Sequence, residues 1–118
     1  MYSTWSFALA GIAALFVVVP ASMAQQLSGE ALAKASSCLA CHQIDKKRVG
    51  PPFTAIAQRF ATSEGAQAYL ADTIRNGSRG RWGAVPMPAQ PQVSAADAQL
   101  LAAWVLSLTS PDTKQAKQ

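Results

Sequence analysis

The sequence has few of the residues that build disulfide scaffolds, acidic tails or nucleic-acid interfaces. Its 118 residues include two cysteines and one histidine, so a fold held together by several disulfides is excluded. Only 14% of the residues are charged and 50% are hydrophobic, which excludes a disordered chain. The net charge of +4 is mildly basic, but the basic residues lack the dense clustering and interleaved aromatics expected of a nucleic-acid-binding protein. This length suits one small domain.

Charged side chains are absent before Glu30. The apolar run from Phe7 to Val19 is followed by a small-x-small pattern that ends at Ala24, which predicts a secretory signal cleaved after that residue. An uncleaved membrane anchor is the alternative, but the run is shorter than the roughly 20 residues that span a bilayer. We therefore expect an exported, periplasmic protein without stable membrane insertion. The expected division is a signal peptide over 1–24, a domain over 25–108 and a polar tail over 109–118.

Hydrophobic spacing and capping residues predict helices, and no segment alternates as a strand would. We expect an alanine-rich helix over residues 28–42 with Ser28 as its N-cap, and a short helix over 53–60. A third helix is expected to be capped by Ser63 and to stop at Asn76-Gly77 in a left-handed cap. The predicted fold class is therefore all-α.

The last predicted helix begins at Ser94 in a capping-box-like pattern with Asp97, carries one apolar stripe and ends at Pro111. The preceding segment, residues 77–92, is rich in glycine and proline. It is predicted to be an ordered loop without regular elements.

The chemistry-bearing motif is Cys38-Leu39-Ala40-Cys41-His42, the C-x-x-C-H signature of c-type haem attachment. On a helix, positions i, i+3 and i+4 share one face, so both thiols and the imidazole can address one flat object. The thiols can form thioethers with the haem vinyl groups, and His42 can reach the iron from one side.

Three other interpretations of the motif compete with haem. A thioredoxin-type dithiol follows a strand of a βαβ unit, and none is visible. Structural zinc takes four ligands, and this motif supplies three. A structural disulfide would leave His42 without a role.

The supply of ligands points to Met87 as the second axial ligand. Beyond the predicted signal there is one histidine and one methionine, so a His/His pair within one chain is impossible. Thioether coordination opposite histidine is typical of electron-transfer cytochromes c. A lone methionine is usually core filler, but Pro86 and Pro88 stiffen the backbone on both sides of Met87.

Together these segments resemble a known family, the small bacterial class I cytochromes c of the cytochrome c-551 type. The similarity runs from about Ser37 to Leu108 and includes the segments CLACHQID, VGPPF, IRNGSRGRWGAVPMP and AAWVLSL. The resemblance implies a compact all-α fold of about four helices around one covalent haem c. It also implies a periplasmic electron shuttle, not an enzyme, working between respiratory-chain donors and terminal reductases, oxidases or peroxidases.

The resemblance also assigns individual roles. Cys38 and Cys41 resemble the thioether sites, and His42 and Met87 the axial iron ligands. Pro51 resembles the residue whose carbonyl accepts the imidazole N–H. Trp82 resembles an indole that donates to a haem propionate, and a core aromatic is the alternative. The expected haem-lining residues are Phe53, Phe60, Leu70, Ile74, Trp104 and Val105.

Two positions depart from the family pattern. Thr73 stands where relatives often carry a basic side chain near a propionate. Gln90 stands in the region where many relatives have an asparagine close to the ligand sulfur.

Two basic segments, Lys46-Lys47-Arg48 and the set Arg75, Arg79 and Arg81, are candidates for a docking rim that steers redox partners with acidic faces. An ordinary solvated surface is the alternative. We expect a monomer that does not bind nucleic acid. Two rivals from other classes are a haem-based ligand binder or weak peroxidase, in which Met87 leaves the iron, and a thiol–disulfide oxidoreductase.

Overall fold

The structure is a computed structural model that describes residue 27 and residues 29–109. The predicted signal, the Ser28 cap, Pro111 and nearly all of the predicted tail lie outside the described residues. Within that described part, no helix is both long and apolar enough to cross a membrane.

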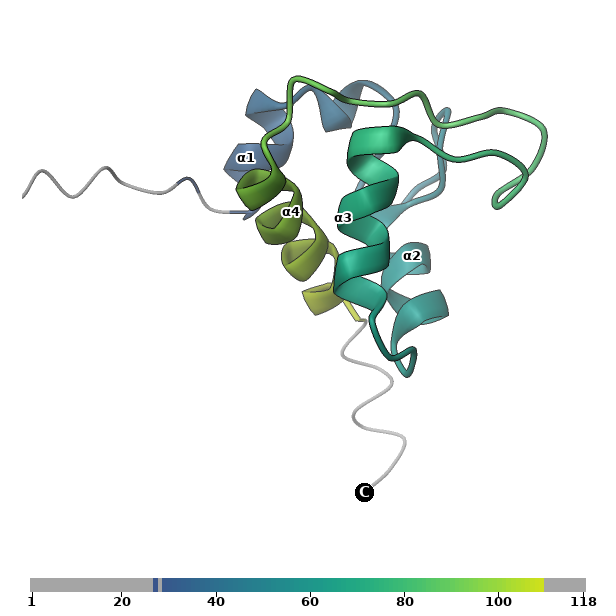
Figure 1. The fold of residues 1–118 in the computed structure, drawn as a ribbon. Helices are drawn as coiled ribbons and strands as arrows, with labels where there is room; N and C mark the ends of the chain where they lie inside the picture. Colours follow the sequence, from purple (N-terminus) through teal and green to yellow (C-terminus); the bar gives the residue numbers. More distant parts are fainter. Residues whose placement is uncertain (1–26, 28, 110–118) are drawn as a thin grey trace, which may run out of the picture.

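The described residues form four α-helices and one 3-10 turn, so the all-α prediction is confirmed (Figure 1). The elements are α1 (Gly29–Ala35), the 3-10 turn η1 (Cys38–Ala40), α2 (Phe53–Phe60), α3 (Ala66–Asn76) and α4 (Ala95–Ser107). Residues 29–109 contain no strand, and the β-type pairing there is one isolated bridge between Ser78 and Met87.

Helix α4 lies at the centre of the bundle and packs against α1, α2 and α3. Ala98 and Ala102 are fully buried on it, and their small side chains let neighbouring helices approach closely. Leu101 is 2% exposed and is the largest side chain at the centre. The core joins α4 to α1 and α3 through Leu32, Ala33, Leu70, Ala71 and Val93.

Both ends of α4 are set by side-chain hydrogen bonds. The predicted N-cap is confirmed, since the Asp97 backbone N–H donates to Ser94 Oγ at 3.0 Å. The predicted end at Pro111 is wrong, because the helix stops at Ser107. The Ser107 hydroxyl donates to the Trp104 carbonyl at 2.6 Å, and the Leu108 N–H turns to the Val105 carbonyl instead.

The expected helix over residues 28–42 is not continuous. Helix α1 ends at Ala35, and Ser37 then adopts left-handed backbone angles, φ 62° and ψ 18°. Two successive serines explain the break, because their hydroxyls compete for backbone hydrogen bonds and weaken a helix interior. The CxxCH motif therefore begins in a separate short turn, η1.

Helix α3 begins later than predicted and stops where predicted. Its N-cap is Gly65 at φ 69°, not Ser63, because the chain reverses through a glycine that tolerates positive φ. It ends at Asn76, and Gly77 follows with φ 80° and ψ 177°. The positive φ agrees with the prediction, but the extended ψ turns the chain directly into the loop instead of forming a left-handed cap.

Candidate cofactor site

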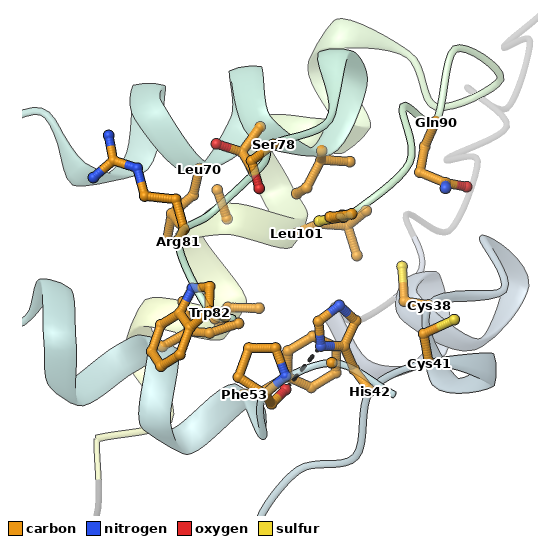
Figure 2. A pocket seen from close by; sticks show the side chains of 18 of the residues that line it. Cys38, Cys41, His42, Phe53, Leu70, Ser78, Arg81, Trp82, Gln90 and Leu101 are labelled. Atoms are coloured by element: carbon orange, nitrogen blue, oxygen red, sulfur yellow. Dashed lines mark hydrogen bonds between the residues drawn. The ribbon is translucent and has the colours of Figure 1, made fainter. Parts of the chain in front are cut away.

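A cavity opens between the helices, the CxxCH turn and the loop of residues 77–92 (Figure 2). It brings together every predicted site residue, namely Cys38, Cys41, His42, Pro51, Trp82 and Met87. The residues predicted to line a haem also lie on its wall: Phe53, Phe60, Leu70, Ile74, Trp104 and Val105. Segments far apart in the sequence thus converge on one mainly apolar space.

The CxxCH segment presents its three side chains to this cavity without being a long helix. The backbone N–H groups of Cys41 and His42 both donate to the Cys38 carbonyl, at 3.2 and 3.0 Å. One tight turn therefore reproduces the shared face that the i, i+3, i+4 spacing predicts. In Figure 2, Cys38 and Cys41 lie at one end of the cavity, beside His42.

The two cysteines form no disulfide with each other, and their surroundings differ. Cys41 is exposed, whereas Cys38 is half-buried and its Sγ lies 4.0 Å from the Ser36 carbonyl oxygen. Burial raises the pKa of the Cys38 thiol above its ordinary value. Disulfide oxidoreductases need a lowered thiol pKa, so this environment disfavours the redox-dithiol interpretation.

His42 is buried, at 9% exposed, and its orientation is set by a hydrogen bond. Its Nδ1 lies 2.8 Å from the Pro51 carbonyl oxygen, drawn as the dashed line in Figure 2. A carbonyl can only accept, so the Nδ1 N–H donates this hydrogen bond and Nε2 is the ring nitrogen left to bind a metal ion. Figure 2 shows that second nitrogen pointing into the cavity, free to bind a metal ion.

A return loop places Pro51 beside His42. The Gly50 N–H donates to the Cys41 carbonyl at 2.8 Å, and the Phe53 N–H at the start of α2 donates to the Gln43 carbonyl at 2.9 Å. A Cβ at Gly50 would lie 2.5 Å from His42 Cε1, so only glycine lets the loop close over the ring.

One aromatic ring packs on the imidazole, and a second packs on the first. Phe53 stacks on His42, with ring centroids 5.0 Å apart and an interplanar angle of 20°. Trp104 of α4 meets Phe53 edge-on at 5.2 Å. His42 is thus fixed through packing contacts as well as its hydrogen bond.

Met87 reaches the cavity from the base of the 77–92 loop. The predicted absence of regular structure there is wrong at one point, because Ser78 and Met87 exchange two backbone hydrogen bonds of 3.0 and 2.9 Å. Gly77 allows this approach, since a Cβ there would lie 2.6 Å from the Met87 carbonyl oxygen. The Gln90 N–H then donates to the Ile74 carbonyl at 3.0 Å and ties the chain back to α3.

Trp82 lies at the end of the cavity opposite the cysteines (Figure 2). It is 38% exposed. The guanidinium of Arg59 covers its ring at 4.6 Å from the centroid. The cavity therefore has an indole at the end opposite the cysteines.

The two departures from the family pattern, Thr73 and Gln90, both lie on the cavity wall. The Gln90 side-chain nitrogen donates to the Pro88 carbonyl at 3.2 Å, and its side-chain oxygen accepts from Gln92 at 2.7 Å. This amide is thus engaged with its own loop.

The donors present fit a covalently attached haem. Two cysteine sulfurs, an imidazole and a thioether line one mainly apolar cavity. Over residues 27 and 29–109, no group of three or more His, Cys, Asp or Glu could hold a metal ion, so a zinc cluster finds no support there.

Sequence reasoning missed three contributors to this site. Gly50 packs on the His42 ring, and its only sequence signal was the Gly-Pro-Pro break. Arg59 and Tyr69 contact the loop through stacking with Trp82 and Arg81, respectively. No local sequence pattern predicts these two contacts, because each joins segments that are distant in the chain.

Comparisons with known proteins give one matching family and several similar proteins. Residues 24–105 match a family described as "Cytochrome C oxidase, cbb3-type, subunit III". The chain is similar to cytochrome c-551 of Pseudomonas aeruginosa, with 53% identity over 78 residues, 66% of this chain and 74% of the relative. It is also 49% identical to cytochrome c-552 of Nitrosomonas europaea over 77 residues, 65% of this chain and 75% of the relative. The crystal structure of wild-type Nitrosomonas europaea cytochrome c552 superposes with a TM-score of 0.65, covering 66% of this chain and 96% of that one.

Proposed function

Because the chain belongs to the class I cytochromes c of the cytochrome c-551 type, we propose that it shuttles single electrons in the periplasm between respiratory-chain donors and terminal reductases, oxidases or peroxidases. As a member of this family it carries one covalent haem c and is an electron-transfer protein, not an enzyme.

One observation carries the proposal. The two thiols, the His42 imidazole and the Met87 thioether converge on a single apolar cavity, although Met87 lies far along the chain from the CxxCH turn. Cys38 and Cys41 would hold the haem through thioethers, and His42 and Met87 would be the axial ligands. When bound, the haem supplies a one-electron Fe(III)/Fe(II) couple.

The chain's own residues tune this couple. The Pro51 carbonyl fixes the proton of His42 on Nδ1 and keeps Nε2 available as a ligand. As a ligand, the Met87 sulfur would favour the reduced iron, and the apolar wall would disfavour the extra positive charge of the oxidised state, so both would raise the potential. With His42 and Met87 both holding the iron, the protein would leave no open site for oxygen chemistry.

Trp82 would donate its indole N–H to a haem propionate at the end of the cavity opposite the cysteines. Its position there, with one ring face covered by Arg59, supports this role. A buried or half-buried propionate needs such donors, because an unsatisfied carboxylate is costly.

Two basic segments close in sequence to cavity-wall residues support a docking face for an acidic partner. Val49 and Val85, on the cavity wall, are 53% and 64% exposed. The basic residues that precede these valines in the sequence are all exposed: Lys46, Lys47 and Arg48 before Val49, and Arg75, Arg79 and Arg81 before Val85. We call this set the basic rim. A positive rim steers association with redox proteins of opposite charge and makes the on-rate fall with salt. The proposed form is a monomer that binds neither nucleic acid nor the bilayer interior.

The experiment that tests the electron-carrier function is an absorption spectrum of the exported protein, oxidised and dithionite-reduced. We expect a c-type reduced spectrum, the weak far-red band of methionine-ligated ferric haem, and no change on adding carbon monoxide to the reduced protein. A c-type spectrum that lacks the band and responds to carbon monoxide would identify a ligand-binding haem protein instead. Free-thiol titration distinguishes the electron carrier from a thiol–disulfide oxidoreductase, because cysteines bound to haem through thioethers leave no reactive thiols.

The basic rim is tested by charge reversal. Replacing Lys46, Lys47 and Arg79 with Glu should slow electron transfer to an acidic partner by about tenfold or more at low salt and flatten the salt dependence. Lys34→Glu on α1 is the matched control, because Lys34 is exposed and does not belong to the rim. An unchanged rate and salt slope in the triple variant would remove the rim from partner steering.

A further inference from the structure

The 77–92 loop is held at its base and at its tip by different contacts. At the base, Ser78 and Met87 exchange two backbone hydrogen bonds and Gln90 is bonded to α3. The tip, residues 79–86, is exposed throughout and projects away from the end of α3 (Figure 1). It nevertheless contributes Arg81, Trp82 and Val85 to the cavity wall, so something must hold it there.

Arg59, in the last turn of α2, makes two contacts with this tip. Its Nη1 donates to the Arg81 carbonyl at 2.8 Å, and its guanidinium lies 4.6 Å from the centre of the Trp82 ring. A planar guanidinium can stack on a ring and donate in its own plane at once, which an ammonium group does less well.

Arg81 makes the reverse contact. Its guanidinium lies 5.0 Å from the centre of the Tyr69 ring on α3, and Tyr69 in turn packs on Phe60 at 5.4 Å. A helix arginine thus stacks on a loop aromatic, and the adjacent loop arginine stacks on a helix aromatic. The two pairs share the Arg59–Arg81 hydrogen bond, so the tip cannot leave α2 without also disturbing its contact with α3.

We propose that Arg59, Trp82, Arg81 and Tyr69 form a reciprocal arginine–aromatic clasp that positions the loop over the cavity and so keeps Met87 in place. Arg59 and Tyr69 are positioning residues, since they act through the loop. The clasp is distinct from partner docking, because its two arginines contact aromatic rings of their own chain. The proposed effect on Met87 rests on the proposed function, whereas the proposed effect on the position of the tip does not.

The test uses the haem-containing protein at high salt and compares Arg59→Gln with the wild type. Two rates are measured: displacement of the methionine by imidazole in the ferric protein, and hydrogen exchange of the tip amides 79–86. Losing a stacking contact of ordinary strength should raise both rates about two- to fivefold. The ferric far-red band of Arg59→Gln before imidazole is added shows that the fold and the haem are intact.

Matched variants separate the clasp from a general loss of charge. Tyr69→Leu should raise both rates as Arg59→Gln does. Tyr69→Phe keeps the aromatic ring, so both of its rates should match the wild type. Lys34→Gln removes one positive charge on α1 and should match the wild type.

Three outcomes overturn the proposal in different ways. If Arg59→Gln and Tyr69→Leu both match Lys34→Gln, there is no clasp. Faster tip exchange with an unchanged imidazole rate would overturn the link to Met87. A wild-type protein without the methionine signature would overturn the proposed ligand, while tip exchange would still decide whether the clasp exists.

Discussion

The two walls of the cavity are held by different kinds of contact. On the histidine wall, the buried ring of His42 is hydrogen-bonded to Pro51, packed against Gly50 and stacked on Phe53, all within a short stretch of chain. On the loop wall, Met87 is half-buried at the base of the 77–92 loop. The tip of this loop is exposed and is bonded to Arg59, which is distant in the sequence.

The contacts of the histidine wall should therefore persist in the folded protein, whereas those of the loop wall can break and re-form. Local, buried contacts are lost only when much of the fold is lost, whereas exposed stacking contacts are individually weak and reversible. A change of ligation or potential should therefore start at the loop wall, and the histidine wall should report mainly on global stability.

The largest effect is expected on the loop wall. Met87→Ala removes the proposed sulfur ligand but leaves Cys38 and Cys41, so the haem should stay attached while the potential falls. The drop should be on the order of 100 mV or more, since axial ligands set haem potentials over about 0.8 V. Redox titration measures it, and an unchanged potential would show that Met87 is not a ligand.

The next effect is expected on the histidine wall. Gly50→Ala would place a methyl group 2.5 Å from His42 Cε1, so the ring or the return loop must shift. Overpacking of this kind costs about 1–3 kcal/mol, which denaturant unfolding of the haem protein would measure. We expect the methionine band to persist. If this variant lost that band before it lost stability, the assignment of separate roles to the two walls would be wrong.

The smallest effect is expected away from both walls. Ser94→Ala removes the acceptor for the Asp97 N–H at the start of α4 and should cost about 1 kcal/mol of unfolding free energy. The potential and the imidazole rate should not change, because no cavity-wall group is altered. A shifted potential would mean that the cavity responds to stability in general.

Local signals explain which parts of the fold could be predicted. Short-range spacing and caps indicated α2, the end of α3 and the Ser94 cap, and the CxxCH motif identified three cavity residues. The errors lie where a side chain or a glycine competes with the helix. Ser37 breaks the first helix, Gly65 replaces Ser63 as a cap, and the Ser107 hydroxyl ends α4 early.

The predicted single apolar stripe of the last helix was also too narrow. Helix α4 is contacted by three other helices, and its exposed positions are mostly small residues, such as Ala96 and Ala103. A helix surrounded on several sides needs no strongly polar face. The clasp could not be predicted from the sequence, because Arg59 and Arg81 lie 22 residues apart and meet only in the folded chain.

The central position of α4 has a thermodynamic consequence. Leu101, Ala102 and Val105 belong to the buried core and also line the cavity, so the interior of the bundle and the cofactor space share one helix. Any group that fills the cavity therefore stabilises the whole bundle. For a ligand held reversibly, that stabilisation would vanish on dilution. A haem bound through thioethers cannot dissociate, so its contribution to stability becomes independent of how much free haem the compartment contains.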